Sequence, residues 1–193
     1  MARPRKFDRE TVLVKAMDVF WAKGYESTSM EDLVDAMGIN RGSLYATFGD
    51  KRRLHLESLD YFYEYEINRM LAPLFQPGPK LSAIREVFEE AVECGGLDGE
   101  RRGCLIYNTA IELCSKDPEV KRRVAAGLKQ VEEGFFQALE QASRDGELGP
   151  GHKPRALARH LTNSLSGLRV MCWVFDDCEM RNDIVESTLA TLS

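Results

Sequence analysis

Apolar residues along the chain recur every three or four positions, and nowhere do β-branched and aromatic residues alternate with polar ones between turn residues. This periodicity is typical of helices that bury one face, so the sequence predicts an all-α fold. Glycine, proline and capping residues divide the pattern into about nine helices. We expect them near residues 9–23, 29–37, 41–48, 51–75, 81–91, 104–113, 118–145, 154–175 and 180–192.

Two short helices in the first quarter of the chain are separated by a tight turn that contains Gly38. Thr28 and Glu31 have the spacing of a capping box, so we expect Thr28 to cap the first short helix. Asn40 can cap the second, and Asp50 can cap the long helix that follows. Two short helices joined in this way form a helix-turn-helix.

The length of the chain sets the domain organisation. A chain of 193 residues can bury one sizeable core together with a satellite unit of about 50 residues. We therefore expect a helix-turn-helix domain over residues 1–52 and a larger helical domain over residues 53–193. The longest helix should carry an apolar stripe from Val120 to Ala142, and Asp117 followed by Pro118 should start it.

Charge is unevenly distributed. The net charge is −5, but up to His55 ten Lys and Arg stand against eight Asp and Glu, which leaves +2 there and −7 for the remainder. Any surface that faces phosphate is therefore expected in the first quarter of the chain.

The composition is that of an ordinary globular protein, with 44% hydrophobic and 30% charged residues. No apolar run approaches the roughly 18 residues of a membrane helix, and the first residues lack an apolar signal region, so no membrane contact and a cytoplasmic location are expected. Five cysteines form no CxxC pair, which indicates free thiols. The three histidines lack metal-ligand spacing, so we expect no metal and no cofactor.

Enzyme motifs are also missing from the sequence. It contains no GxSxG elbow, phosphate-binding glycine loop, HExxH pair or dinucleotide fingerprint, so we expect no enzymatic activity. The alternative to a DNA-binding protein is a helical protein-interaction module. Such a module would not require cations and hydroxyls to be grouped around one short helix.

The second short helix carries side chains that suit DNA. Arg41 can reach guanine edges or phosphate, Gly42 allows close backbone approach, and Ala46 can meet a thymine methyl group. Hydroxyls, a phenol and a cation around it suit phosphate. The candidate DNA contacts are Thr28, Ser29, Arg41, Gly42, Ser43, Tyr45, Ala46, Thr47 and Lys51, whereas Leu44 and Phe48 should face the core. For any one residue, capping or packing is an equal alternative.

The runs from Gly24 to Met30 and from Gly38 to Lys51 resemble the DNA-binding signature of TetR-family repressors. The resemblance implies a homodimer formed by the last two helices, a palindromic double-stranded DNA operator, and release from DNA when a small-molecule inducer binds. It implies phosphate or base contacts for all the candidates above except Ala46. The basic arm of Arg3, Arg5 and Lys6 matches the family more loosely; it either enters an adjacent minor groove or is a disordered tail.

The second domain offers candidates for sensing a ligand, because polar or aromatic residues interrupt otherwise apolar helices. These are Tyr65, Tyr107, Asn108, Glu112, Phe136, Arg169 and Trp173, for each of which core packing is the alternative. Cys104 follows two arginines at a helix start, which favours a thiolate; it is either a sensor or a small buried residue. The segment around it resembles a TetR-family branch that includes sensors of electrophiles and of small unsaturated acids.

The dimer face is expected on the last long helices, at Leu161, Leu165, Leu168 and Cys172. Periodicity does not distinguish a core face from an interface. The sequence also leaves repression and activation open, although repression is the usual outcome in the family that the chain resembles.

Overall fold

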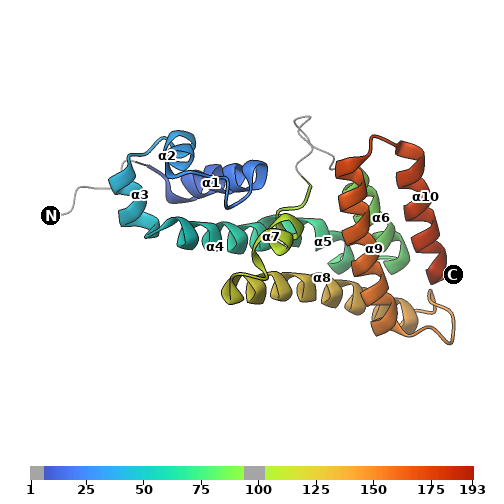
Figure 1. The fold of residues 1–193 in the computed structure, drawn as a ribbon. Helices are drawn as coiled ribbons and strands as arrows, with labels where there is room; N and C mark the ends of the chain where they lie inside the picture. The colour runs from blue at the N-terminus through green and yellow to red at the C-terminus, as the bar shows by residue number, and fades with distance from the viewer. Residues whose placement is uncertain (1–6, 94–102) are drawn as a thin grey trace. The chain divides into compact units, whose positions relative to one another are not determined.

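The computed structural model describes residues 7–93 and 103–193. Among these residues every regular element is helical and none is a strand, so the predicted fold class is confirmed. The elements in Figure 1 are α1 (Arg9–Lys23), α2 (Met30–Met37), α3 (Arg41–Phe48), α4 (Lys51–Phe62), the π-helical turn η1 (Tyr63–Ile67), α5 (Asn68–Phe75), α6 (Lys80–Glu93), α7 (Leu105–Leu113), α8 (Pro118–Arg144), α9 (Pro154–Val174), α10 (Cys178–Leu189) and the 3₁₀ turn η2 (Ala190–Leu192).

The helices form two compact units, each assembled from two separate stretches of chain. The head unit consists of Met1–Tyr65 and Leu105–Val124, and the second unit consists of Glu66–Cys104 and Ala125–Ser193. The head unit therefore contains α7 and the first residues of α8 as well as the helix-turn-helix. The sequence pattern did not predict this association.

The core of the head unit lies where α1 packs against α2 and α4. Removing each large apolar side chain from water contributes about 1.5–3 kcal/mol, so this core fixes the arrangement of the three helices. Its most deeply buried members are Ala16, Phe20, Leu33, Met37, Leu44, Phe48 and Leu54.

Side-chain caps define where the head helices begin. The side chain of Asn40 accepts from the N–H of Ser43 at 2.8 Å, and that of Asp50 accepts from the N–H of Arg53 at 2.7 Å, so both predicted caps are confirmed. A cap of this kind contributes about 1 kcal/mol. Asp117 likewise accepts from the first amides of α8, as predicted.

The predicted cap of α2 is wrong by one residue. Ser29 caps this helix, and its hydroxyl accepts from the N–H of Asp32 while the Asp32 carboxylate accepts from the N–H of Ser29. Thr28 is 2% exposed, and its hydroxyl donates to the carbonyl of Gly24 at 2.6 Å. Thr28 thus stabilises the preceding turn from its buried side. The exposed Ser29 is left to accept a hydrogen bond from a free amide at the start of α2.

The helix predicted over residues 51–75 is interrupted. Between α4 and α5 lies the π-helical turn η1, in which each turn takes up an additional residue. The wider turn leaves no break in the apolar pattern of the sequence, because apolar residues continue on both sides of it.

In the second unit, α6 packs against α5, α9 and α10. Phe88 of α6 lies 6.0 Å from Phe135 of α8, measured between ring centroids. The four residues expected at a dimer face are at most 5% exposed in the single chain: Leu161, Leu165, Leu168 and Cys172. They belong to the core of this unit, because side chains already buried cannot gain burial from a partner subunit.

Candidate DNA interface

The short helix α3 presents one polar face to solvent. Arg41, Gly42, Tyr45 and Ala46 are exposed, and Ser43 and Thr47 are half-buried. Leu44 and Phe48 are 0% and 2% exposed and face the core, as predicted. The side chains that could reach base edges therefore share an accessible surface, which is the arrangement that a recognition helix requires.

Arg41 is held only loosely within this face. Its Nη1 lies 3.3 Å from Oε1 of Glu31, and its guanidinium lies 5.9 Å from the centre of the Tyr45 ring. Tyr45, and then Glu31, raise the pKa of Arg41 above its ordinary value. Both members of the ion pair are exposed, so the pair contributes little stability and the guanidinium can exchange Glu31 for a DNA acceptor.

The remaining phosphate candidates flank α3. Ser29 is exposed at the start of α2, and its hydroxyl bonds to Asp32 at 2.8 Å. Lys51, at the start of α4, places Nζ 4.4 Å from the centre of the Tyr25 ring. Thr28 does not reach this surface, because it is buried. Its expected contact with phosphate stays a prediction, whereas its contact with the preceding turn is seen directly.

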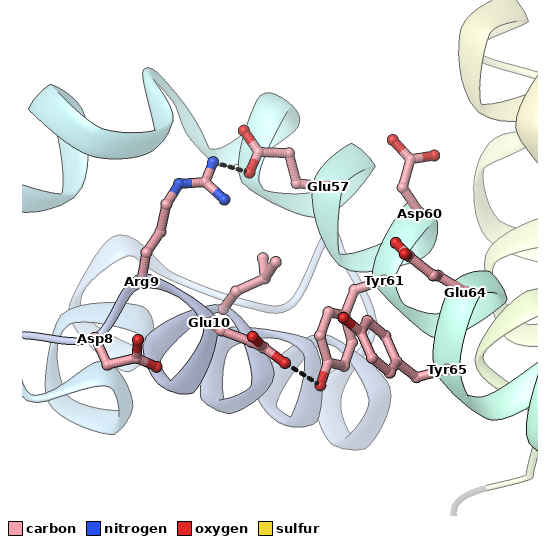
Figure 2. A pocket seen from close by; sticks show the side chains of 9 residues that line it. Asp8, Arg9, Glu10, Glu57, Asp60, Tyr61, Glu64 and Tyr65 are labelled. Atoms are coloured by element: carbon pink, nitrogen blue, oxygen red, sulfur yellow. Dashed lines mark hydrogen bonds and ion pairs between the residues drawn. The ribbon is translucent and has the colours of Figure 1, made fainter.

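A groove of about 480 Å³ lies elsewhere on the head unit, between the start of α1 and the end of α4 (Figure 2). The groove is lined by five carboxylates and by one guanidinium. This guanidinium belongs to Arg9, and it forms an ion pair with Glu57 at 2.5 Å. Tyr61 stacks on Tyr65 with ring centroids 4.2 Å apart. The charges of Glu10 and Glu64 raise the pKa of Tyr65. A surface this acidic repels phosphate, so the groove is not the DNA site.

Apart from Cys104, the sequence offers seven ligand candidates, and these are divided between the two units. Tyr65, Tyr107, Asn108 and Glu112 lie in the head unit, and Phe136, Arg169 and Trp173 lie in the second unit. Of these, Tyr65 lines the acidic groove. In the second unit, the Arg155 guanidinium covers the Phe136 ring at 3.5 Å, Arg169 Nη2 lies 3.1 Å from the sulfur of Met70, and Trp173 is 49% exposed.

Cys104 is 4% exposed, and Cys104, Cys114, Cys172 and Cys178 are all free thiols. A reactive thiol needs access to its reagent, so the burial of Cys104 favours the packing interpretation. The arginines proposed to activate it, Arg101 and Arg102, lie outside the described residues, as do Cys94 and the basic arm at residues 3–6.

Residues 7–93 and 103–193 show neither a metal site nor a helix that could span a membrane. In that part of the chain no three His, Cys, Asp or Glu side chains group closely enough to hold a metal ion. No helix there combines the length and the apolar character that crossing a membrane demands.

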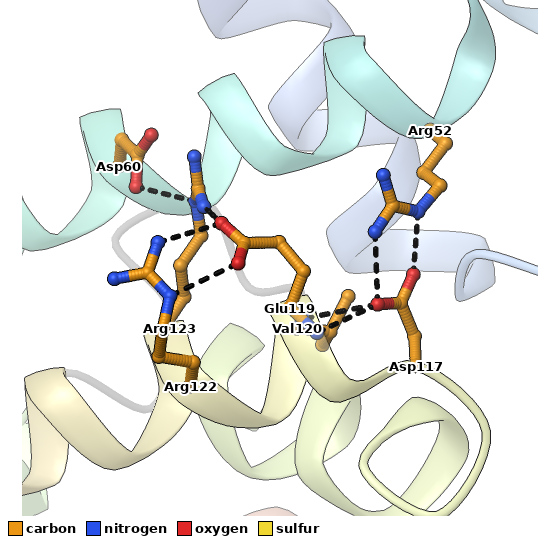
Figure 3. A network of polar contacts seen from close by, with 7 residues as sticks. All are labelled: Arg52, Asp60, Asp117, Glu119, Val120, Arg122 and Arg123. Carbon is orange, nitrogen blue, oxygen red and sulfur yellow. Dashed lines mark hydrogen bonds and ion pairs between the residues drawn. The ribbon is translucent and has the colours of Figure 1, made fainter.

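The sequence pattern did not predict a set of contacts that α7 and the start of α8 make with the rest of the head unit. The carboxylate of Glu112 accepts from two backbone amides in the turn between α1 and α2. Asp117 forms a two-bond ion pair with Arg52 of α4, at 2.6 and 2.9 Å, and Arg123 bonds Asp60 at 2.9 Å (Figure 3). The local sequence signalled only the cap role of Asp117 and the unfavourable place of the Glu112 carboxylate near the end of its helix.

Comparison with known proteins gives matches over most of the chain. Residues 12–57 match the family model described as bacterial regulatory proteins, tetR family, and residues 77–187 match the tetracyclin repressor-like C-terminal domain. The uncharacterized HTH-type transcriptional regulator YezE of Bacillus subtilis is 37% identical over the whole of both chains. The HTH-type transcriptional repressor ComR of Escherichia coli is 30% identical over 87% of this chain and 80% of its own length.

A solved structure is similar as well. It contains a cysteine mutant of the TetR family transcriptional regulator CifR complexed with 26-bp double-strand operator DNA. It superposes with a TM-score of 0.86 at 30% sequence identity, over 99% of this chain and 100% of that one.

Proposed function

Because the chain belongs to the tetR family of bacterial regulatory proteins, we propose that it is a DNA-binding transcriptional repressor that binds a palindromic operator as a homodimer. The observation that carries this proposal is the exposed polar face of α3, with Arg41 and Tyr45 open to solvent above the buried Leu44. The operator complex of the similar CifR chain supports the same mode of binding.

Each exposed or half-buried residue of this surface has a proposed role. Arg41 reads a base edge or holds phosphate, Gly42 allows the backbone to approach, and Ala46 contacts a thymine methyl group. Hydroxyls and charges beside them position the helix on the backbone without reading sequence. This second group consists of Ser29, Ser43, Tyr45, Thr47 and Lys51, with Thr28 supporting the turn before α2.

The homodimer has a suitable surface in the second unit. At the end of α9 and just after it, four large apolar side chains are 42–61% exposed: Val170, Trp173, Val174 and Phe175. A contiguous exposed apolar stretch marks an interaction surface in a protein that is otherwise well packed. We place the partner subunit there, on α9 and α10, rather than on the buried leucines of α9.

The signal that releases DNA is proposed to be a small molecule sensed by residues 53–193, while residues 1–52 bind DNA. The ligand candidates stay those named above, and an electrophile acting at Cys104 is the alternative signal. We also propose that the protein acts in the cytoplasm and that it binds its partners without catalysing a reaction.

Selection of duplexes from a randomised pool, followed by gel shifts at two salt concentrations, tests this function. We expect a selected palindrome to bind tightly, and Arg41→Ala to weaken binding to it by about tenfold or more, since a bidentate base contact is worth about 1–3 kcal/mol. A chain that binds no duplex at low salt would refute the proposal and favour a protein-interaction module.

A further inference from the structure

The turn between α1 and α2 is held by a carboxylate from a distant part of the chain. Oε2 of Glu112 accepts from the N–H of Tyr25 at 2.9 Å, and Oε1 accepts from the N–H of Glu26 at 2.7 Å. Both oxygens of one side chain thus satisfy neighbouring amides that lie 87 and 86 residues away. Charge-assisted bonds of this kind are stronger than neutral ones.

The backbone of the turn is shaped for this contact. Gly24 has φ +79°, and a Cβ atom there would lie 3.2 Å from Oε2 of Glu112. A side chain at this position would be strained by the backbone angle and would press on the carboxylate, so glycine suits both requirements. Glu112 also stands next to the last residue of α7, where the helix dipole disfavours a negative charge. Its position is therefore explained by the turn it holds and not by its own helix.

The turn leads directly into the DNA-facing part of the head. Thr28 bonds back to Gly24, and the next residue, Ser29, caps α2. Tyr25 packs its ring against His55 at 4.9 Å and Phe20 at 6.0 Å, measured between centroids. Movement of the turn would therefore be passed to the start of α2 within a few residues.

The other end of the helix-turn-helix is held by the same distant segment. Asp117 pairs with Arg52, which lies on the first turn of α4 just after α3 ends (Figure 3). Arg52 lowers the pKa of Asp117 to about 2, so the pair is ionised at neutral pH. Between these two contacts, Lys116 bonds Glu26 at 3.1 Å.

We propose that residues 112–117 form a brace that holds both ends of the helix-turn-helix, with Glu112 and Asp117 as positioning residues for DNA binding. The brace grips the chain immediately before α2 and immediately after α3, so it fixes the tilt of α3 without touching DNA. This inference rests on the proposed DNA-binding function. It also makes α7 the part of the head unit through which DNA affinity can be adjusted.

The variants Glu112→Gln and Asp117→Asn test the brace. The first keeps the size of the side chain but leaves one amide facing an NH₂ group. The second keeps a good helix cap, since Asn caps as well as Asp, while removing the charge that binds Arg52. Glu89→Gln is the matched control, because it also removes an exposed carboxylate from an arginine pair, with Arg85 on α6 of the second unit.

The readouts are the affinity of the full-length protein for a duplex that the wild type selects from a random pool, and for a random-sequence duplex of equal length. We expect each brace variant to bind the selected duplex about fivefold to tenfold more weakly, at the low end of typical coupling between sites. The random duplex should be affected less, and the salt dependence should not change, because no phosphate contact is lost.

If the variants acted only through their change in net charge, the change in DNA affinity would have the opposite sign. Removing a negative charge makes the protein less repulsive to DNA, so Glu89→Gln should leave affinity equal or slightly higher. Hydrogen exchange supplies a direct measurement, since Glu112→Gln should speed exchange at the Tyr25 and Glu26 amides.

Unchanged affinity for the selected duplex in both variants would overturn the brace while leaving the proposed function intact. Unchanged exchange at the two amides in Glu112→Gln would also overturn it. A wild-type chain that selects no duplex would instead refute the proposed function. Should Glu112→Gln not fold, Asp117→Asn with unchanged affinity would still count against the brace.

Discussion

The buried imidazole of His55 gives the head unit a dependence on pH that can be worked out from its surroundings. His55 is 1% exposed, its Nδ1 has no hydrogen-bond partner, and its ring lies 4.9 Å from that of Phe20. Burial, and then the charge of Lys51, lower its pKa from 6.5 to about 4, against a smaller opposing effect of Asp117. The imidazole is therefore neutral in the folded protein at pH 7.

The unfolded chain binds a proton at His55 near pH 6.5, whereas the folded chain does so only near pH 4. Between these values the unfolded state holds more protons, so stability falls as pH is lowered through this window. The full difference between the two pKa values corresponds to about 3 kcal/mol of folding stability, and about 2 kcal/mol of this stability is lost between pH 7.5 and pH 5.

The assay compares the wild type with His55→Leu by urea unfolding at pH 7.5 and pH 5, at one fixed protein concentration. We expect the wild type to lose about 2 kcal/mol more free energy of unfolding than the variant. The carboxylates of Asp32, Asp117 and Glu119, whose pKa values are lowered to about 2, titrate alike in both proteins and cancel. Equal losses in the two proteins would refute the reasoning.

Three further predictions concern DNA, the dimer and the thiol. The double variant Tyr45→Ala, Lys51→Ala should weaken binding to all duplexes, and the slope of log affinity against log salt concentration should fall by an amount that corresponds to about one or two phosphate contacts. A loss of affinity confined to one sequence would contradict the phosphate role. Trp173→Glu with Val174→Asp should give a monomer in sedimentation, since charges cannot be buried in an apolar interface, and an unchanged dimer would move the interface elsewhere. Cys104 should react with iodoacetamide at pH 7 more slowly than glutathione does, and faster reaction that also releases DNA would restore the sensor hypothesis.

Local chemistry explains why most helix boundaries could be predicted. Caps such as Asn40 and Asp50 act on amides three residues away, so the sequence contains both partners of each contact. The cap of α2 was harder, because two adjacent hydroxyls are each followed, three residues later, by an acid. Which of them turns inward depends on the buried packing of Thr28, which no local pattern records.

Contacts between distant segments could not be predicted. Glu112 has the apolar neighbours of a pocket residue, and its true partners lie 86 and 87 residues earlier in the chain. The one available signal was a carboxylate at the unfavourable end of a helix dipole. The buried face of α9 posed a similar difficulty, since Leu165 would show the same periodicity against its own chain or against a second subunit.

The composition of the head unit from two stretches of chain also governs its biosynthesis. A fragment ending at residue 65 would lack the carboxylate that satisfies the Tyr25 and Glu26 amides and the aspartate that neutralises Arg52. We therefore expect the nascent head to complete its packing only after residue 124 has left the ribosome. An excised helix-turn-helix fragment should therefore be a poor substitute for the whole protein in binding studies.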